Sequence, residues 1–372
     1  MGRENVVKFD HLDLCMSSRA FERPDIEPFS VLLLGNFLSG AGGRLAVCEE
    51  LAGQLESRGW QVLRASARLN RLARLWDMLH TAWTHRGRYR AAHVDVFSGS
   101  AFVWAELACG LLVRTGCPFL LTLHGGSLPH FARRWPRRVS RLLMSADAVT
   151  SPSPYLCEEL RRYRGDILLV PNALDLSRYE FRPRLQPQPR LIWLRSFHRI
   201  YNPLMAVEAF ALITLAAPEA RLTMIGADKG DGSFDDTRNL ARELGVADRV
   251  SFIRGVPKAE VPARLHDGDV LLNTSITDNT PVSVMEAMAC GLCVVSTDSG
   301  GLRYLIQDGN EGLLTTSGDA QGMANAVMRI LNDSQLATKL SCGGRRKIEE
   351  FDWPAVLPQW ESLFAGVARS FC

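Results

Sequence analysis

Residues 30–64 read SVLLLGNFLSGAGGRLAVCEELAGQLESRGWQVLR. The first five residues of this stretch form an apolar run that predicts a buried strand, and a glycine-rich turn follows and ends at Gly43. Apolar residues near helical spacing then predict an amphipathic helix over 44–58, and a second strand begins at Gln61. A strand, a turn, a helix and a second strand in this order are the building unit of a parallel sheet.

The alternation of strands and helices continues along the chain and is interrupted once. Apolar runs of strand length, separated by helical stretches, recur at 93–97, 119–123, 148–151 and 167–170. A segment rich in Pro and Gln, 181–190, reads as a linker. After it, strand-like runs resume at 191–194, 221–225, 250–253, 270–272 and 293–296. Because short buried strands that alternate with helices are typical of open α/β sheets, the sequence predicts two Rossmann-like, doubly wound domains.

The predicted division of the chain follows from this pattern. We expect a polar tail, a first domain, the linker, a second domain and a C-terminal helix that crosses back to the first domain, at 1–28, 29–180, 181–190, 191–350 and 351–372. A length of 372 residues suits two domains of ordinary size. Ligands of such sheets bind beyond the carboxyl ends of the strands, so chemistry is expected in a cleft between the two domains.

Composition narrows the class of protein. Hydrophobic residues make up 47% of the chain and charged residues 22%, which excludes the disordered, fibrous and disulfide-scaffold classes. Nine cysteines lack a regular spacing, and the N-terminus lacks a secretory pattern, which favours reduced thiols and a cytoplasmic location. The pair Cys290 and Cys293 stands in an apolar run and predicts core packing rather than a metal or redox site.

Positive charge is concentrated in one region. Between Arg58 and Arg141 there are fourteen arginines and three acidic residues, a net charge of +11, against +3 for the whole chain. The plain interpretation is a set of solvated helix faces whose arginine stems cover apolar surface. Because Trp and Tyr are interspersed with these arginines, contact with the anionic headgroups of a membrane surface is favoured over it. Nucleic acid suits the charge, but no recognition motif accompanies it.

The most membrane-like stretch lies inside this region. It runs from Val96 to Val113, but Glu106 and two glycines interrupt it. The stretch therefore predicts a helix buried in a domain rather than a membrane span, and contact with a membrane is expected to be peripheral.

The strongest signal for function is the string Asp278-Asn-Thr-Pro-Val-Ser-Val-Met-Glu286. It begins in a polar loop directly after a buried strand, and a helix is expected from about Pro281, a favoured first helical position. The free N–H groups and the positive end of such a helix form an anion site that fits a diphosphate. Asp278 can then accept hydrogen bonds from sugar hydroxyls and Glu286 from a ribose. The alternative is an acidic helix cap and an ordinary surface glutamate.

This string resembles the donor-site signature of the family 4 glycosyltransferases of the GT-B fold, which is usually Glu-x7-Glu. Here the first carboxylate is Asp278, one methylene shorter, and the likeness extends over about 31–360. The resemblance implies that Asp278 orients the donor sugar, that Glu286 holds the ribose, and that phosphate is bound by the backbone of Asn279, Thr280, Pro281 and Val282. The shorter acid bears on which sugar is bound more than on whether transfer occurs.

Three weaker positions resemble the same family. His124, in LLTLHGG, ends a strand and can donate to a sugar hydroxyl or to charge that develops in the transition state, although loop backbone is an alternative partner. Gly42 and Gly43 can let backbone N–H groups approach phosphate or acceptor, with a plain tight turn as the alternative. Arg254 follows a strand where the family binds the nucleotide base, although a simple strand-ending turn explains it as well.

A fourth position departs from the family pattern. Family members usually carry an Arg and, five residues later, a Lys after the first strand of the second domain, where they stabilise the departing diphosphate. A strict register places Ser196 and Tyr201 there. Among the neighbouring cations Arg195, His198 and Arg199, we favour Arg195 for this role, with a solvent-facing arginine as the alternative.

The functional hypothesis combines these signals. The resemblance implies a retaining glycosyltransferase that moves a sugar from a nucleoside-diphosphate sugar to a hydroxyl acceptor in polysaccharide or glycolipid assembly, with no cofactor and no obligatory metal ion. The basic surface points to a lipid-linked acceptor. Two alternatives stay open: a nucleotide-sugar 2-epimerase of the same fold, and a non-catalytic homologue in a polysaccharide assembly complex. The altered Arg/Lys position keeps the second of these open.

Overall fold

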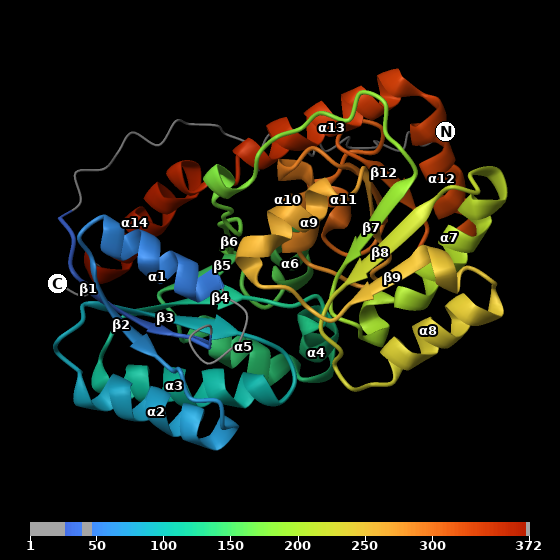
Figure 1. Ribbon diagram of the computed structural model, residues 1–372. Helices are drawn as coiled ribbons and strands as arrows, with labels where there is room; N and C mark the ends of the chain where they lie inside the picture. Colours follow the sequence, from blue (N-terminus) through green and yellow to red (C-terminus); the bar gives the residue numbers. More distant parts are fainter. Residues whose placement is uncertain (1–26, 39–46, 370–372) are drawn as a thin grey trace, which may run out of the picture.

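The computed structural model describes residues 27–38 and 47–369, which form two α/β domains (Figure 1). The expected tail at 1–28 and the Gly42–Gly43 turn lie almost wholly outside the described residues. The prediction of two Rossmann-like, doubly wound domains is confirmed, because each domain contains a six-stranded parallel sheet with helices on both faces.

The first domain has the strand order β2-β1-β3-β4-β5-β6. Its strands are β1 (Ser30–Leu34), β2 (Gln61–Ala65), β3 (Ala91–Val96), β4 (Phe119–Leu123), β5 (Ala148–Ser151) and β6 (Leu168–Leu169). Its helices are α1 (Val47–Ser57), α2 (Arg71–Thr84), α3 (Ser100–Thr115), α4 (Leu128–Arg134), α5 (Pro136–Met144) and α6 (Pro154–Leu160).

The burial of β1 on both faces of the sheet explains its run of apolar residues. Because successive side chains point to opposite faces, Val31 and Leu33 pack with α1 on one face, whereas Leu32 and Leu34 pack with α2 and α3 on the other. Both faces of the sheet are covered by helices, so all four side chains are buried. A strand buried on both faces reads as a continuous apolar run, as this one does.

The second domain has the strand order β12-β11-β10-β7-β8-β9. Its strands are β7 (Arg190–Leu194), β8 (Arg221–Ile225), β9 (Val250–Ile253), β10 (Val270–Asn273), β11 (Cys293–Thr297) and β12 (Leu313–Thr315). Its helices are α7 (Pro203–Ala216), α8 (Ser233–Glu243), α9 (Val261–His266), α10 (Val282–Ala289), α11 (Leu302–Leu305), α12 (Ala320–Asn332) and α13 (Ser334–Glu349). Cys290 and Cys293 are buried in its two core layers, as the sequence predicts.

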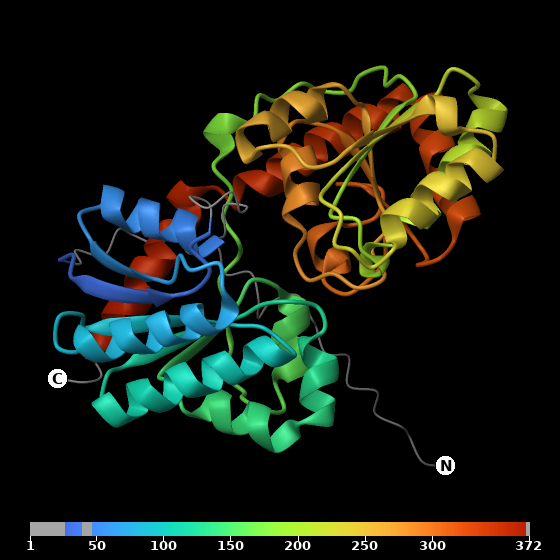
Figure 2. The same cartoon turned by 60° about the horizontal axis from the view of Figure 1, so that its bottom comes forward.

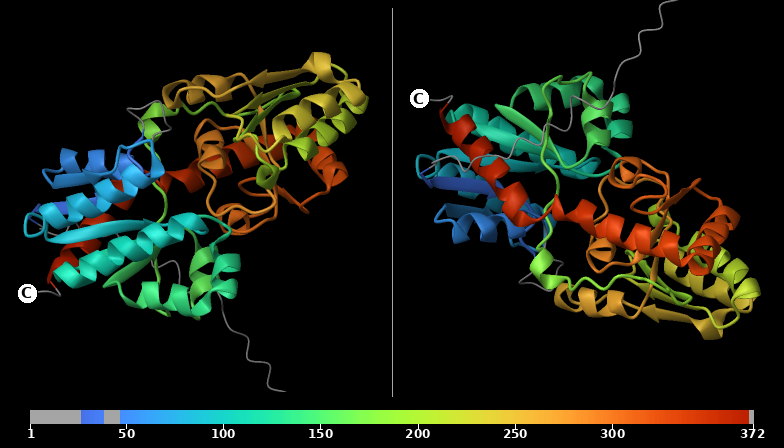
Figure 3. Two further views of the ribbon diagram at one scale, coloured as in Figure 1. Left: turned by 90° about the horizontal axis from the view of Figure 1, so that it is seen from below. Right: turned by 90° about the horizontal axis from the view of Figure 1, so that it is seen from above.

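The C-terminal helix α14 (Trp353–Arg369) joins the two domains into one molecule. It continues from α13 of the second domain and packs against α1, β3 and β4 of the first, where Trp360 and Phe364 are buried (Figures 2 and 3). The indole nitrogen of Trp60 donates to Glu361 at 3.2 Å and ties the end of the first strand–helix unit to this helix. The last helix of the chain therefore completes the core of the first domain.

Two helices have features that their sequences alone do not reveal. Helix α8 begins at Ser233, because Gly232 takes a φ of 86° and the carboxylate of Asp231 accepts from the Ser233 N–H at 3.1 Å. Helix α3 packs into the first domain, as expected, but it buries one face only, and Val103, Leu107 and Val113 on its other face are exposed. Among the described helices, none has the length and apolar character that a membrane crossing needs.

Candidate active site

The topology of each sheet marks where a ligand site can form. In the second sheet, β7 lies between β8 and β10. In the first sheet, β1 lies between β2 and β3. At such a switch point the two connections diverge and leave a crevice beyond the carboxyl ends of the strands. Arg195 directly follows β7, and the loop 274–281 directly follows β10. The residues with the strongest sequence signal therefore stand at the switch point of the second sheet.

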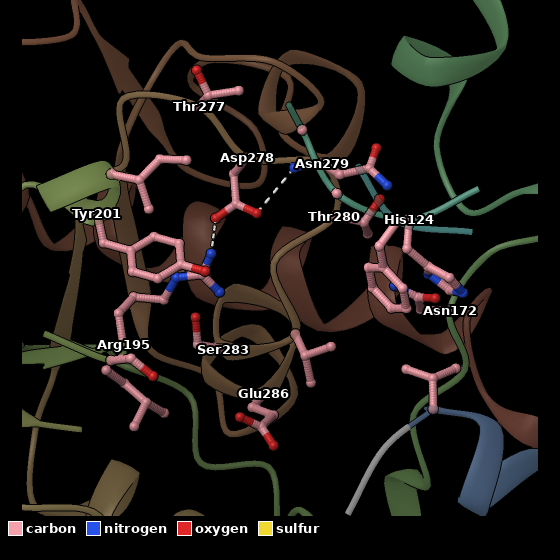
Figure 4. A pocket seen from close by; sticks show the side chains of 18 of the residues that line it. His124, Asn172, Arg195, Tyr201, Thr277, Asp278, Asn279, Thr280, Ser283 and Glu286 are labelled. Atoms are coloured by element: carbon pink, nitrogen blue, oxygen red, sulfur yellow. Dashed lines mark hydrogen bonds and ion pairs between the residues drawn. The ribbon is translucent and has the colours of Figure 1, made fainter. Parts of the chain in front are cut away.

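A cleft of about 480 Å³ lies between the two domains at this point (Figure 4). The first domain contributes Val47, Glu50, Phe97, Ser98, His124, Gly125, Gly126 and Ser127, and the chain between the domains contributes Asn172 and Ala173. The second domain contributes Arg195, Ser196, Tyr201, Lys258, Thr277, Asp278, Asn279, Thr280, Val282, Ser283 and Glu286, together with Leu194, Ile200, Val256 and Val261. Six of the residues singled out for donor chemistry thus share one cavity with His124 from the opposite domain.

Asp278 and Arg195 form a charged pair inside this cleft. The guanidinium of Arg195 donates from Nη2 to Oδ2 of Asp278, and its Cζ lies 4.1 Å from the centroid of the Tyr201 ring (Figure 4). Both charged side chains are largely buried. A cation over the face of an aromatic ring and against a carboxylate is held in one orientation. The pair places one positive and one negative group side by side in the cleft.

The amino end of α10 opens into the same cleft. Pro281 precedes the helix in an extended conformation, none of the described side chains caps the helix, and Val282 and Ser283 of its first turn line the cavity. Behind the loop, Gly300 and Gly301 pack so closely that a Cβ on either would stand 2.1 Å from the carbonyl oxygen of Asp278 or 1.7 Å from that of Asn279. These two glycines therefore allow the loop to reach its position ahead of the helix.

Glu286 lies one side-chain layer deeper. Its Oε1 accepts a hydrogen bond of 2.8 Å from the hydroxyl of Tyr179, which belongs to the chain that connects the domains. Burial, followed by the negative charge of Glu286, raises the pKa of Tyr179 far above its usual value, so the phenol stays protonated and donates. This contact fixes the Glu286 carboxylate at the cavity wall, with oxygens that can accept from a ligand.

On the facing wall, His124 is held by a carboxylate that the sequence analysis did not single out. Its Nε2 lies 2.9 Å from Oδ1 of Asp95, and its ring stacks on Phe97 with the centroids 5.0 Å apart. Burial alone would raise the pKa of Asp95, but the charge and hydrogen bond of His124, with His93 nearby, more than offset burial and lower it. Because Asp95 occupies one ring nitrogen of His124, the ring is oriented and the other nitrogen remains for a ligand.

A buried polar chain continues behind Asp95. The ring Nε2 of His93 lies 3.6 Å from Oδ1 of Asp95 and 2.7 Å from the hydroxyl of Thr122, which in turn lies 2.7 Å from the hydroxyl of Thr150. Burial lowers the pKa of His93 to about 4, with the positive charge of His124 adding to the effect and Asp95 opposing it. His93 is therefore neutral in the folded protein at neutral pH.

The depressed pKa of His93 predicts a loss of stability in mild acid. Between its folded pKa of about 4 and its unfolded pKa of about 6.5, the unfolded chain binds one more proton than the folded chain, so the free energy of unfolding falls as the pH falls. From pH 7 to pH 5 this one histidine is expected to remove about 2 kcal/mol. Urea unfolding of the wild type and of His93→Gln at both pH values measures it, and an equal fall in both proteins would contradict the assignment.

The remaining predicted site residues divide into three groups. Asn279 and Thr280 line the cleft but also contact the first domain, since Ser153 donates to the Asn279 side chain and the Thr280 hydroxyl donates to the Pro152 carbonyl at 3.3 Å. Arg254 is not among the residues that line the cleft, because its guanidinium lies over the Phe234 ring, 4.3 Å from the centroid. Gly42 and Gly43 lie outside the described residues.

The cleft also holds an ion pair that sequence reasoning missed. Lys258, which follows β9, donates from Nζ to Oε1 of Glu50 in α1 at 2.5 Å, and both residues line the cavity. The two residues are 208 positions apart and belong to different domains. The position of Lys258 in the cleft could have been predicted, because Lys258 follows the end of the same strand as Arg254. Its pairing with Glu50 could not, because no sequence pattern links the two residues.

Comparison with protein families divides the chain as the two sheets do. Residues 30–178 match the model described as Glycosyltransferase Family 4, and residues 180–347 match the model described as Glycosyl transferases group 1. Among curated proteins, the chain is similar to the D-inositol 3-phosphate glycosyltransferase of Corynebacterium aurimucosum, with 32% identity over 167 residues. The match covers 44% of this chain and only 40% of that relative's length.

Solved structures show the same fold over most of the chain. Sucrose-phosphate synthase from Thermosynechococcus elongatus superposes with a TM-score of 0.76 at 21% identity and covers 92% of this chain and 100% of its own. The Anabaena protein HepE, solved in complex with UDP and glucose, superposes with a TM-score of 0.73 at 18% identity and covers 91% of this chain and 100% of its own. Taken with the matches of both halves to glycosyltransferase models, these likenesses show that the chain belongs to the family 4 glycosyltransferases, transferase enzymes of the GT-B fold.

Proposed function

We propose that this enzyme transfers a sugar, with retention of configuration, from a nucleoside-diphosphate sugar to a hydroxyl acceptor in polysaccharide or glycolipid assembly. The observation that carries the proposal is the uncapped amino end of α10, which opens into the interdomain cleft between Asp278 and Glu286. A diphosphate suits that helix end, and the two carboxylates suit hydroxyl groups on either side of it. The HepE structure with UDP and glucose supports a nucleotide-linked donor for this fold.

In this proposal, each group of residues in the cleft has a separate role in the transfer reaction. The diphosphate rests on the first turn of α10, and Arg195 stabilises the charge that develops as it leaves. His124, oriented by Asp95, donates to a hydroxyl of the donor sugar or to the reacting centre. In a front-face reaction, the bond from the anomeric carbon to the phosphate oxygen breaks, the acceptor oxygen bonds to the same face, and the acceptor proton passes to the leaving phosphate.

Incubation with UDP-, GDP- and ADP-sugars tests the proposal. The expected result is release of a nucleoside diphosphate from one class of donor, slow with water and faster with a hydroxyl acceptor. An unchanged rate in EDTA is expected, since no metal is part of the proposal. Conversion of UDP-GlcNAc to its 2-epimer without an acceptor would instead support the epimerase, and the absence of both binding and turnover would support a non-catalytic homologue.

We also propose that the enzyme works at the cytoplasmic face of a membrane, with α2 as the contact surface. Apolar side chains stand out from this helix: Leu72 is 78% exposed, Trp76 63% and Trp83 49%. Arg71 and Arg86 accompany them on the same segment, and Arg86 lies over the Trp83 ring at 4.3 Å. Exposed aromatic and aliphatic groups with flanking arginines match the interface of an anionic bilayer.

Changing this surface should weaken vesicle binding. Leu72→Ser combined with Trp76→Ser removes apolar area that would enter the interface, so binding to vesicles with anionic lipid is expected to fall roughly tenfold or more. Co-sedimentation at low and high salt measures it. Leu215→Ser is the matched control, because Leu215 is 81% exposed on α7 of the second domain. Equal vesicle binding by the double variant and the wild type would refute a contact through α2.

A further inference from the structure

A second hollow, of about 190 Å³, lies in the first domain beside the donor cleft. It is lined by the carboxyl ends of β1 and β3, by the first turns of α2 and by the start of α3. These two strand ends form the switch point of the first sheet, which is the place where an α/β sheet accommodates a ligand. Phe97 lines both cavities, and Asp95, which lines the hollow, holds His124 in the cleft. The hollow and the proposed site of transfer therefore share the Phe97 side chain as a common wall.

Two arginines face this hollow without an acidic partner. Arg74 donates to three neutral oxygens: the side chain of Asn36 at 2.8 Å, the carbonyl of Arg68 at 2.7 Å and the carbonyl of Leu69 at 3.1 Å. Arg71 lines the hollow beside it, and among the described residues neither guanidinium forms an ion pair. Two such cations in one cavity leave a positive charge that nothing in the described part of the chain compensates.

Other features of the hollow agree with an uncompensated positive charge. Burial, and then the charge of Arg71, lower the pKa of Arg74, as expected when two cations are held close together. Within the described part of the chain, no side chain caps the amino end of α3, where Ser100 lines the cavity. Among the described residues that line the hollow, Asp95 is the only acid, and its carboxylate is already engaged by His124 at 2.9 Å. The balance of charge in the hollow therefore favours an anion.

We propose that the hollow is a subsite for an anionic group, a phosphate, carried by the acceptor and bound by Arg71 and Arg74. Guanidinium groups present paired N–H donors that match phosphate oxygens, so the two side chains can hold such a group in a defined orientation. An acceptor anchored there would direct a hydroxyl past Phe97 toward His124. The acceptor role rests on the proposed function, but anion binding in the hollow can be measured without turnover.

The test compares two substitutions that remove the same charge from the same segment. Arg71→Gln removes a guanidinium that has no hydrogen bond or ion pair with the described residues, whereas Arg86→Gln removes an exposed one beyond the far end of α2. Inorganic phosphate is titrated calorimetrically into each protein with the donor cleft filled by the nucleoside diphosphate that binds best. We expect wild type and Arg86→Gln to bind phosphate alike and Arg71→Gln to bind at least about tenfold more weakly. Equal affinities in all three proteins, or no saturable binding to the wild type, would overturn the proposal.

A second arm identifies the source of the phosphate. Vesicles of phosphatidylcholine with phosphatidylinositol and vesicles with the same fraction of phosphatidylglycerol are compared, because the two carry the same charge and differ in the headgroup. Weaker binding of Arg71→Gln to the phosphatidylinositol vesicles alone indicates a lipid headgroup, and a defect confined to inorganic phosphate indicates a soluble phosphorylated acceptor. If no nucleoside diphosphate binds, the proposed function fails, while the difference between Arg71→Gln and Arg86→Gln still reports on the hollow.

Discussion

Glu286→Gln is expected to lower kcat/KM for the nucleotide sugar by roughly 100-fold. The change keeps the shape of the side chain and an oxygen that can accept from Tyr179 at the observed 2.8 Å, but it removes the charge. A hydrogen bond to a charged group contributes about 1.5–3 kcal/mol, and a ribose has two hydroxyls to offer. Steady-state kinetics with the preferred donor measure the effect, and an unchanged melting temperature would show that the fold is kept.

Tyr179→Phe is the matched control for this prediction. It removes the phenol that donates to Glu286 but leaves the carboxylate in place, so a loss of about tenfold or less is expected. If Glu286→Gln retained wild-type kcat/KM, the carboxylate would not contact the donor, and the assignment of this wall of the cleft to the ribose would be wrong.

Arg195→Met is expected to lower kcat by about 100- to 1000-fold, the usual effect of removing one group that stabilises developing charge. Arg195 is the cation that pairs with Asp278 in the cleft, and its guanidinium is fixed over the Tyr201 ring. Without it, Asp278 is left largely buried and unpaired, where its charge also opposes a diphosphate. Single-turnover measurements separate this effect on chemistry from an effect on donor binding.

Two further variants make the result specific. Arg199→Met removes a nearby cation that is 72% exposed and does not line the cleft, so it should leave kcat within about twofold of the wild type. Combining Arg195→Met with Asp278→Asn should recover part of the donor affinity, because the unpaired charge is gone, but not the rate. Equal losses from Arg195→Met and Arg199→Met would indicate a general electrostatic effect and not a role at the leaving group.

Local sequence patterns were sufficient for the architecture. Residues 31–34 are buried on both faces and are therefore all apolar, and the inner strands β4, β10 and β11 are likewise buried along their whole length and mostly apolar. Pro281 marked the start of α10 because its ring suits a helix start, and the structure begins that helix one residue later. The exposed face of helix α3 was not predicted, because an apolar stretch with one exposed face has nearly the same composition as a buried one.

The sequence predicted single site residues that directly follow a strand, but it did not predict the contacts between residues from different strands. Asp278 and Arg195 could be proposed separately, each at a strand end, but their pairing depends on β7 lying beside β10, which spacing does not reveal. The partners Tyr179 of Glu286 and Asp95 of His124 are 107 and 29 positions away in the chain. Such contacts are set by how sheets and domains pack, and a single sequence carries no signal of that kind.

Nucleoside diphosphate binding by a matched pair of variants tests the central claim most directly. Ser283 lies in the first turn of α10 and lines the cleft, so Ser283→Glu places a negative charge where the diphosphate is proposed to rest. An acidic residue in a first turn favours the helix itself, and Ser283→Gln has the same size without the charge. By calorimetry, we expect Ser283→Glu to bind the nucleoside diphosphate at least about tenfold more weakly than Ser283→Gln. Equal binding by the two variants would contradict a diphosphate at the amino end of α10.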